Sequence, residues 1–226
     1  MSAPVPVRRR IDPAVVVSGP PGSGKTTFAT ALARAARLVL LDLDDVAGPL
    51  TAAALALCGA TEAALDDGEL GTALRDARYA SLLATAESNL GLGLGVVTVA
   101  PFTRERSSSE AWDELARHLG HDAALCYLDC PVPLLLERLE RRAAPRDAAK
   151  LASTAAYAAV ALSVPPVAPH LRIDATAPLD IQVGRAIEAL GLVTATAPDG
   201  APTLTAPAPA PTLTAPDGVA TLVPPC

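Results

Sequence analysis

The stretch GPPGSGKT (19–26) stands between the short apolar run AVVVS (14–18) and a helical pattern that places Phe28, Leu32 and Ala35 on one face. It fits G-x-x-x-x-G-K-[ST], the P-loop pattern, in the strand–loop–helix setting that this pattern requires. By average residue usage, a chance match in a chain of this length is expected on the order of once in a hundred sequences. The stretch therefore predicts a phosphate-binding loop between a buried strand and a helix.

The chemistry of such a loop comes mainly from its backbone. Glycines allow successive N–H groups to turn into one concavity, and the positive end of the following helix dipole adds to this nest for phosphate oxygens. Lys25 is expected to reach the β- and γ-phosphates, and the Thr26 hydroxyl to hold Mg²⁺. The sequence thus predicts ATP and Mg²⁺ as ligands, with ATP contacts from Gly19, Pro21, Gly22, Ser23, Gly24, Lys25, Thr26 and Thr27.

Short apolar runs separated by helical patterns predict the fold. The expected strands are AVVVS (14–18), RLVLLDLD (37–44), GVVTVA (95–100), AALCYLD (123–129) and HLRID (170–174). Strands that are apolar on both faces and alternate with helices are typical of a parallel sheet covered on both sides. We therefore expect an α/β protein with the three-layer P-loop NTPase fold and a five-stranded parallel sheet.

Apolar stripes and capping signals place the helices. One stripe consists of Tyr79, Leu83, Ala86 and Leu90, and another, after a capping box at Ser107-x-x-Glu110, of Trp112, Leu115, Ala116 and Leu119. Pro131 and Pro133 fit a first helical turn that continues from Leu134 to Arg142, and a final helix is expected from about Leu179 to Leu190. The stretch GLGLG (91–95) precedes a strand, whereas a dinucleotide fingerprint follows one, so it predicts a helix-to-strand connection.

Two carboxylates end the second predicted strand, in LLDLDD. If the strand continues, Asp42 and Asp44 project to the same side, at the edge where parallel sheets place their ligands. One carboxylate could then orient Mg²⁺ while the other accepts a proton from a substrate hydroxyl. The alternative is a helix N-cap formed by Asp44 or Asp45.

Arginines supply the third element of the predicted site. Arg138 and Arg142 share a helix face, and Arg146 follows in APRDAAK. Guanidinium groups can clamp phosphates in a transition state or stack on adenine. The alternative is that these arginines form a solvated polar face.

Composition limits the possible functions. The chain has 226 residues, 50% of them hydrophobic, with a formal net charge of −6 and few aromatic residues. This excludes wholesale disorder and argues against a nucleic-acid surface, which is usually basic. The longest uncharged stretch, 151–169, contains three prolines, so it does not match the ~20 apolar residues of a membrane span.

The two ends of the chain differ from its middle. We expect residues 1–12 to form a flexible arm, and they lack the apolar segment of a secretory signal. We expect residues 195–226, where PTLTAP occurs twice, to form a Pro/Ala/Thr-rich disordered tail. The domain is expected to span 13–194. Cys126 and Cys130 flank an apolar run, which predicts buried thiols and fits a reducing cytoplasm.

These features resemble the small P-loop kinases of the adenylate-kinase-like group. The resemblance is strongest to the set of AAA family ATPases and predicted kinases that includes polynucleotide 5′-kinase and zeta-toxin-like, shikimate, gluconate and chloramphenicol kinases. It covers roughly residues 14–191 and rests on GPPGSGKTTFA, LDLDD, LDCPVPLLLERLERR with PRDAAK, and HLRIDATAP.

The resemblance implies roles for individual residues. Asp44 would be the base that activates the acceptor hydroxyl, and Asp42 the Mg²⁺-side carboxylate. Arg138 would lie near the adenine, with Arg142 and Arg146 in a lid over the phosphates. The segment 46–90 would bind the acceptor.

The chain departs from the family pattern at two places. Ala100 and Pro101 stand where many P-loop enzymes end the third strand with a Walker B aspartate, so Mg²⁺ would depend on Thr26 and Asp42. Ala47 replaces an arginine that often follows the acidic pair, and Arg104 or Arg106 could take its place in contacting the acceptor.

Three functions fit these observations. The first is a cytoplasmic kinase that moves the γ-phosphoryl group of ATP to a hydroxyl of a small molecule. The second is a nucleotide-binding regulatory ATPase with a partner that reads the tail, which the missing Walker B acid and the PTLTAP repeat suggest. The third is a 5′-hydroxyl polynucleotide kinase, against which the net acidity and the lack of interleaved aromatic residues argue.

Overall fold

Five parallel strands form one sheet in the part of the chain that the structure, a computed structural model, describes: residues 13–65, 68–120, 122–142 and 165–194. The strand order is β2-β3-β1-β4-β5, so the strand before the P-loop is central. The strands are β1 (Ala14–Ser18), β2 (Val39–Asp42), β3 (Val96–Val99), β4 (Ala124–Asp129) and β5 (His170–Asp174). The predicted five-stranded parallel sheet of a P-loop fold is confirmed.

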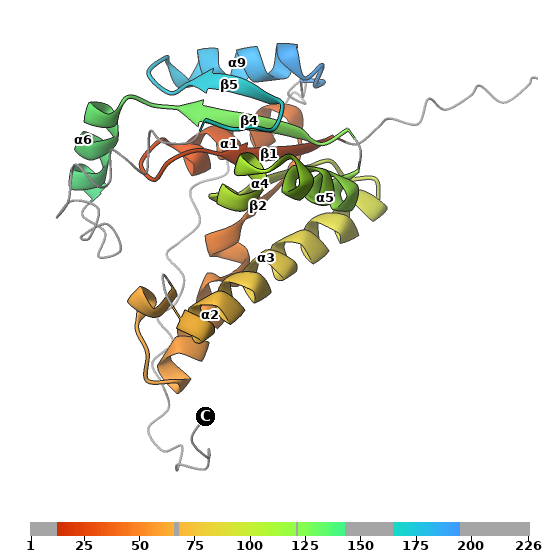
Figure 1. Ribbon diagram of the computed structural model, residues 1–226. Helices are drawn as coiled ribbons and strands as arrows, with labels where there is room; N and C mark the ends of the chain where they lie inside the picture. The colour runs from red at the N-terminus through yellow and green to blue at the C-terminus, as the bar shows by residue number, and fades with distance from the viewer. Residues whose placement is uncertain (1–12, 66–67, 121, 143–164, 195–226) are drawn as a thin grey trace, which may run out of the picture. The chain divides into compact units, whose positions relative to one another are not determined.

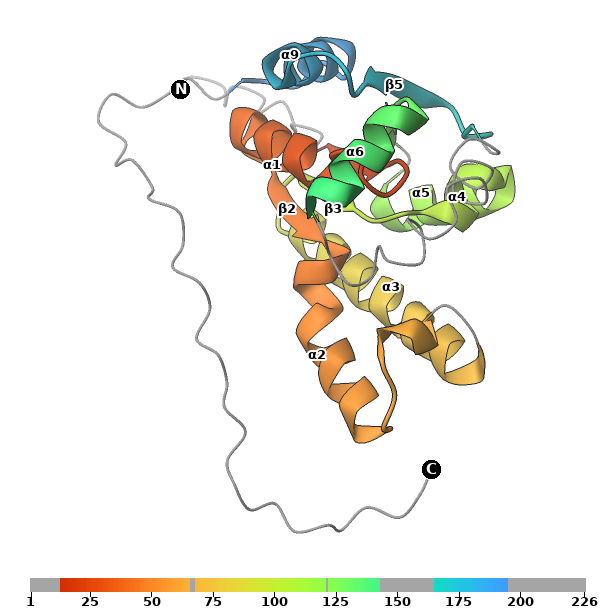
Figure 2. The ribbon, with the colours of Figure 1, turned by 90° about the vertical axis from the view of Figure 1, so that its left-hand side faces the viewer.

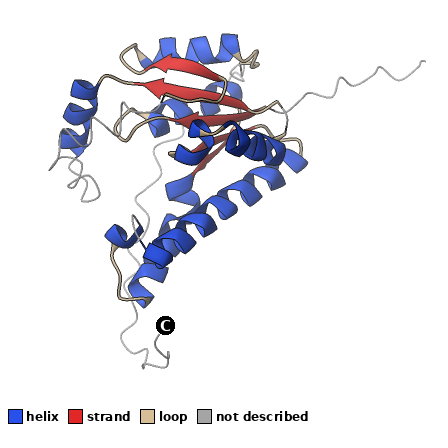
Figure 3. Ribbon diagram, viewed as in Figure 1, coloured by secondary structure: helices blue, strands red, loops and turns tan. Residues whose placement is uncertain are grey.

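Helices cover both faces of this sheet (Figures 2 and 3). Helix α1 (Lys25–Ala36) and helix α9 (Leu179–Ala189) pack on one face. The other face is covered by α3 (Gly68–Gly91), the short α4 (Thr103–Ser107) and α5 (Ser109–Leu119). These are the three predicted layers.

Each face has its own apolar core, because successive residues of a strand point to opposite sides of the sheet. Val15 and Val17 of β1 pack with Phe28 and Leu32 of α1, whereas Val16 packs with the opposite layer. The two predicted stripes on the far side also lie in or against the core, and they comprise Tyr79, Leu83, Ala86 and Leu90 of α3 and Trp112, Leu115, Ala116 and Leu119 of α5. The periodicity therefore identified the buried faces correctly.

Helices α2 (Leu43–Leu57) and α3 pack against each other and extend beyond the β2 edge of the sheet (Figure 1). The short 3₁₀ helix η1 (Glu62–Leu65) lies between them in the chain. Helix α6 (Val132–Arg142) follows β4 and packs Leu135 and Leu139 inward. The region between β2 and β3 thus consists mainly of a pair of helices, and the first of them, α2, begins where β2 ends.

Two predicted boundaries are wrong. Strand β2 ends at Asp42 instead of continuing to residue 44, because the Asp42 side chain caps the helix that starts at Leu43. The N-cap of α5 is Ser108, not Ser107: its hydroxyl accepts a hydrogen bond from the backbone N–H of Ala111. The final helix and the connection at 91–95 agree with the prediction.

The predicted arm, 1–12, and tail, 195–226, lie outside the described residues, so the domain boundaries stay predictions. Among the helices that are described, none combines the length and the apolar character that crossing a bilayer requires. Cys126 and Cys130 are buried, as predicted, whereas Cys58 at the end of α2 is exposed. Burial raises the pKa of the Cys126 thiol to about 12.

Candidate active site

The P-loop joins β1 to α1 with the backbone conformation that its glycines allow. Gly22 has φ +83° and Gly24 has φ +95°, in the left-handed region that other residues rarely adopt. Gly24 is also the N-cap of α1, so no side chain at the N-cap bonds to the first N–H groups of the helix. The first turn of α1 contains no acidic residue either. The N–H groups at this helix end are therefore presented to a cleft without a carboxylate of the same turn to compete for them.

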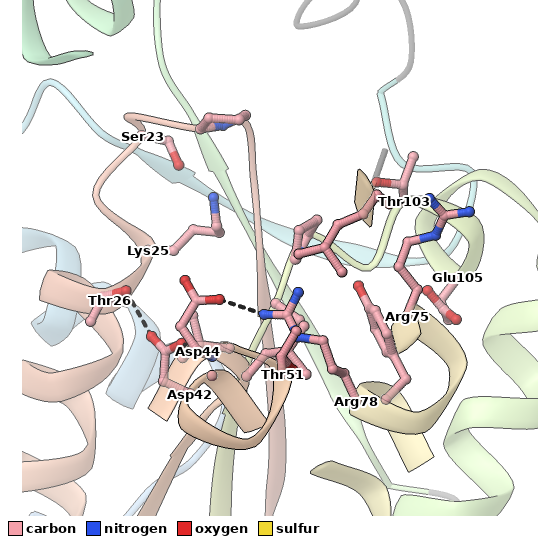
Figure 4. A pocket seen from close by; sticks show the side chains of 18 of the residues that line it. Ser23, Lys25, Thr26, Asp42, Asp44, Thr51, Arg75, Arg78, Thr103 and Glu105 are labelled. Atoms are coloured by element: carbon pink, nitrogen blue, oxygen red, sulfur yellow. Dashed lines mark hydrogen bonds and ion pairs between the residues drawn. The ribbon is translucent and has the colours of Figure 1, made fainter. Parts of the chain in front are cut away.

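Two side chains of the loop face this cleft (Figure 4). The ammonium group of Lys25 donates hydrogen bonds to the carbonyl oxygens of Gly19, at 2.9 Å, and Pro20, at 3.0 Å. The Ser23 hydroxyl is buried and has no hydrogen-bond partner among the described residues. A buried hydroxyl without a partner is costly unless a ligand bonds to it, and phosphate oxygens fit that requirement.

The Thr26 hydroxyl donates a 2.8 Å hydrogen bond to Oδ2 of Asp42, which brings the two predicted metal ligands together. Oδ1 of the same carboxylate accepts from the backbone N–H of Asp44 at 3.0 Å. Asp42 is buried, with 7% of its surface exposed. Its two hydrogen bonds fix the first turns of α1 and α2 to the end of β2. A hydroxyl and a carboxylate are the hard oxygen donors that Mg²⁺ prefers, so these residues fit the ion.

Asp44 lies in the first turn of α2, and not on the strand. The expectation that Asp42 and Asp44 share one side of a strand is therefore wrong, and so is the alternative of an N-cap at Asp44 or Asp45, because Asp42 is the cap. Asp44 still lines the same cleft as Lys25. The first turn of α2 brings its carboxylate to the cleft, and not the alternation of side chains along a strand.

One ion-pair partner of Asp44 is Arg78, a residue of the predicted acceptor segment 46–90 that no sequence motif singles out. Arg78, in the middle of α3, donates from Nη2 to Oδ1 of Asp44 at 2.7 Å. The Arg78 side chain is only 16% exposed, whereas that of Asp44 is 52% exposed. One feature of the sequence could have pointed to Arg78. It directly precedes Tyr79, and the apolar stripe that begins at Tyr79 marks the helix face that turns toward the sheet.

Arg138 is tied to the P-loop. Its guanidinium donates to the carbonyl oxygens of Ser23 and Ala175, both at 3.0 Å. It therefore links α6, the P-loop and the loop after β5 at the cleft, where we predicted a nucleotide contact. Arg142 is the last residue of α6, and Arg146 lies outside the described residues, so their predicted roles are not tested.

The two arginines considered as substitutes at position 47 behave differently. Arg104 lines the cleft and forms an exposed ion pair with Glu114 at 2.8 Å. Arg106 is 7% exposed; it donates to the hydroxyl of Tyr127 at 3.2 Å and stacks its guanidinium over that ring. The expectation that Arg106 could contact an acceptor is therefore wrong, because its side chain points into the interior.

The cleft has a volume of about 1840 Å³ and extends from the P-loop to α2, α3, α4 and α5. Typical small-molecule sites occupy about 300–1,000 Å³, so this cleft has room for a nucleotide and a second ligand. We call the part lined by the P-loop, Arg138 and Gln182 the nucleotide half, and the part lined by Asp44, Arg78, Tyr79, Thr103 and Glu105 the acceptor half. In Figure 4, Thr103 and Glu105 lie across the space from Lys25 and Thr26.

Solved structures share this fold at low sequence identity. A sugar kinase from Janibacter sp. HTCC2649 is 21% identical with a TM-score of 0.57, over 79% of this chain and 94% of that one. A gluconokinase from Sinorhizobium meliloti 1021 is 20% identical with a TM-score of 0.53, over 80% and 93%. An APS kinase from Mycobacterium tuberculosis, solved with AMPPNP and APS, is 22% identical with a TM-score of 0.50, over 79% and 96%.

No curated protein matches the sequence. A family model does: the AAA domain family AAA_33 matches residues 15–166, which include the P-loop, the Asp42–Thr26 pair and the Asp44–Arg78 pair. The match spans more than half of the chain and begins in the strand that leads into the phosphate-binding loop. The chain therefore belongs to this AAA domain family of P-loop proteins.

Proposed function

We propose that the protein is a kinase that transfers the γ-phosphoryl group of ATP to a hydroxyl group of a small-molecule acceptor. The observation that carries this proposal is the position of Asp44. Its carboxylate lines the cleft that the P-loop and Lys25 also line, and much of it is open to the solvent-filled space. A protein that only bound nucleotide would need no proton acceptor beside a second ligand space.

The nucleotide half fits ATP. The amides at the start of α1 and the buried Ser23 hydroxyl offer donors for phosphate oxygens, and Lys25 adds a positive charge beside them. Thr26 and Asp42 would hold Mg²⁺, which supplies neutralisation of the negative charge on the phosphates. Arg138 would brace the loop from the side of α6.

The reaction then requires a proton transfer and one exchange of bonds to phosphorus. Asp44 accepts the proton of the acceptor hydroxyl, and the acceptor oxygen forms a bond to the γ-phosphorus. The bond from this phosphorus to the bridging oxygen breaks, and ADP leaves with the electron pair. Lys25 stabilises the charge on the transferring group, because such reactions depend on positioning and electrostatic stabilisation.

Arg142 and Arg146 belong to the proposal as the residues that would close over the phosphates. The missing carboxylate at Ala100 and Pro101 favours a second candidate, a regulatory ATPase that hydrolyses ATP slowly. The two functions differ in one measurable respect. A kinase forms a phosphorylated acceptor in equal amount to ADP, whereas an ATPase forms ADP and inorganic phosphate.

The test is a screen of ATP consumption against neutral polyols, nucleosides and hydroxylated antibiotics, with the product identified by mass spectrometry. Asp44→Asn removes the proton acceptor while preserving shape, and we expect its turnover to fall about 10²- to 10⁴-fold. The matched control is Asp45→Asn, one residue away in the same turn but outside the cleft, which should keep wild-type turnover. Product formation at the full rate by Asp44→Asn, or ADP release that no acceptor stimulates, would refute the proposal.

A further inference from the structure

The acceptor half is bounded on one side by α4, which is held in a fixed orientation. Arg106 of this helix is anchored in the interior by its bond to the Tyr127 hydroxyl and its stacking over the Tyr127 ring. The backbone carbonyl of Arg106 also accepts from the N–H of Val167 at 2.7 Å. With α4 anchored in this way, Thr103 and Glu105 of the same helix line the cleft (Figure 4).

The carboxylate of Glu105 is half-buried in this position. Apart from a bond to its own backbone amide, it has no hydrogen-bond or ion-pair partner within the described ranges. Burial raises the pKa of this carboxyl group above its usual value, although the bond to its own amide and the charge of Arg104 act in the opposite direction, and Glu114 adds a smaller increase. Partial burial of a carboxylate whose only bond within the described ranges is to its own amide is unfavourable, so a ligand that donates hydrogen bonds here would be stabilised.

Three arginines that line the acceptor side of the cleft, Arg75, Arg78 and Arg104, each have a partner among the described residues. Arg78 is paired with Asp44, and Arg104 is paired with Glu114. Arg75 donates to the carbonyl of Leu65 and to the Thr72 hydroxyl. An anionic acceptor would compete with these partners and would also face the charge of Glu105. A ligand with hydrogen-bond donors would meet neither obstacle.

Tyr79 contributes a second polar group beside Glu105. Its hydroxyl accepts a 3.0 Å hydrogen bond from the backbone N–H of Phe102, and its ring packs edge-on against the Phe102 ring. Burial, with Glu105 as a smaller contribution, raises the pKa of Tyr79 to about 12, so the phenol keeps its proton at neutral pH. The wall formed by Tyr79 and Glu105 is thus neutral to negative.

We propose that Glu105 determines acceptor specificity by accepting hydrogen bonds from a second hydroxyl or an ammonium group of the acceptor. The acceptor is then a neutral or cationic polyhydroxylated molecule, and not a hydroxy acid or a phosphorylated sugar. This inference rests on the proposed kinase function and deepens it. The phosphorylated hydroxyl lies at Asp44, and the second donor lies at Glu105.

The experiment measures phosphorylated product with four probes: ribitol, 2-deoxystreptamine, gluconate and glucose 6-phosphate. We expect product from ribitol or 2-deoxystreptamine, with the better of the two showing whether hydroxyl or ammonium groups are preferred. Glu105→Gln should raise the KM for that probe at least about tenfold and change kcat much less, since the site loses a charged acceptor. Glu105→Asp, which keeps the charge, should restore part of the loss. The control is Glu188→Gln on the exposed surface of α9, away from the cleft, which should change neither parameter.

The outcomes separate the two proposals. Preferential phosphorylation of gluconate or glucose 6-phosphate, or an unchanged KM in Glu105→Gln, would overturn the role of Glu105 and leave the kinase function standing. A failure of all four probes and of the wider acceptor screen, with ATP converted only to ADP and inorganic phosphate, would overturn both. Thermal unfolding of each variant distinguishes a specificity effect from misfolding, and Glu105→Asp keeps the test valid if the Gln variant is unstable.

Discussion

The two halves of the cleft are built in different ways. In the nucleotide half, the phosphate-binding groups come from one continuous stretch, residues 19–26, which the backbone conformation at Gly22 and Gly24 shapes, and Arg138 and Gln182 complete the lining. In the acceptor half, Asp44, Arg78 and Glu105 come from three separate helices, α2, α3 and α4, which tertiary packing brings together. One half is therefore a local structure, whereas the other exists only when the helices are assembled on the sheet.

This difference determines how each half should respond to substitution. A local structure depends on the conformation of a few backbone residues and on charges at fixed places. An assembled site depends on contacts between side chains that are distant in sequence, such as Arg78 and Asp44, which are 34 residues apart. Apart from the proton acceptor Asp44, we therefore expect the largest effects in the nucleotide half and graded ones in the acceptor half.

Among the substitutions outside Asp44, the largest effect is expected for Lys25→Ala. This change removes the positive charge beside the phosphates, and the rate of phosphoryl transfer should fall about 10³-fold, since a single preorganised donor contributes about 10²–10³ in comparable sites. Arg34→Ala, which removes one charge from the exposed last turn of the same helix, should keep the wild-type rate. Steady-state kinetics with ATP measure both. Equal rates for the two variants would contradict the assignment of the nucleotide half.

The same contrast explains what could be predicted from sequence. The strands, the buried helix faces and the P-loop were predictable, because each is encoded by neighbouring residues with a fixed period or spacing. The pairing of Arg78 with Asp44 was not, since it depends on how α3 crosses the end of β2. The inward direction of Arg106 was also missed, because Tyr127, the side chain to which it donates, lies on the distant strand β4.

The extent of β2 shows a further limit. The run RLVLLDLD is apolar enough to continue as a strand through residue 44, but in the structure it ends at Asp42, whose carboxylate accepts the capping hydrogen bond from the N–H of Asp44. An aspartate favours an N-cap, but the two that follow it at 44 and 45 have the same preference. Local propensity therefore predicted a helix start near this place without identifying which aspartate forms it.

A smaller effect, on stability, is expected when a substitution disturbs the backbone of the P-loop in the nucleotide half. In Gly22→Ala, the new Cβ would lie 3.1 Å from the carbonyl oxygen of Leu135 and 3.1 Å from Cγ of Leu139, at a residue with φ +83°. Forcing a residue with a side chain into this region costs about 1–2 kcal/mol of unfolding free energy, which corresponds to a decrease in Tm of about 2–8 °C. Differential scanning calorimetry measures the change.

The matched control for this substitution is Gly184→Ala in α9, where the new Cβ would meet no described residue within 4 Å beyond its chain neighbours and the backbone of its own helix. Because alanine favours a helix interior more than glycine does, this variant should gain about 0.5–1 kcal/mol. The two changes add the same methyl group, so opposite signs show that the loop conformation, and not the added volume alone, decides the outcome. A Gly22→Ala protein as stable as the wild type would mean that the loop relaxes to another conformation.

The smallest effect is expected for Arg78→Lys in the acceptor half. Lysine keeps the positive charge near Asp44 but replaces the rigid guanidinium by a flexible ammonium, so the carboxylate is held less firmly. We expect kcat to fall about threefold to tenfold while the KM for ATP stays constant, because Arg78 acts through Asp44 and lies away from the P-loop. Arg117→Lys on the exposed face of α5 is the control and should match the wild type. If Arg78→Lys lowers only Tm and leaves kcat unchanged, Arg78 joins α2 to α3 without positioning the base. The reaction would then not depend on how firmly the ion pair holds the Asp44 carboxylate.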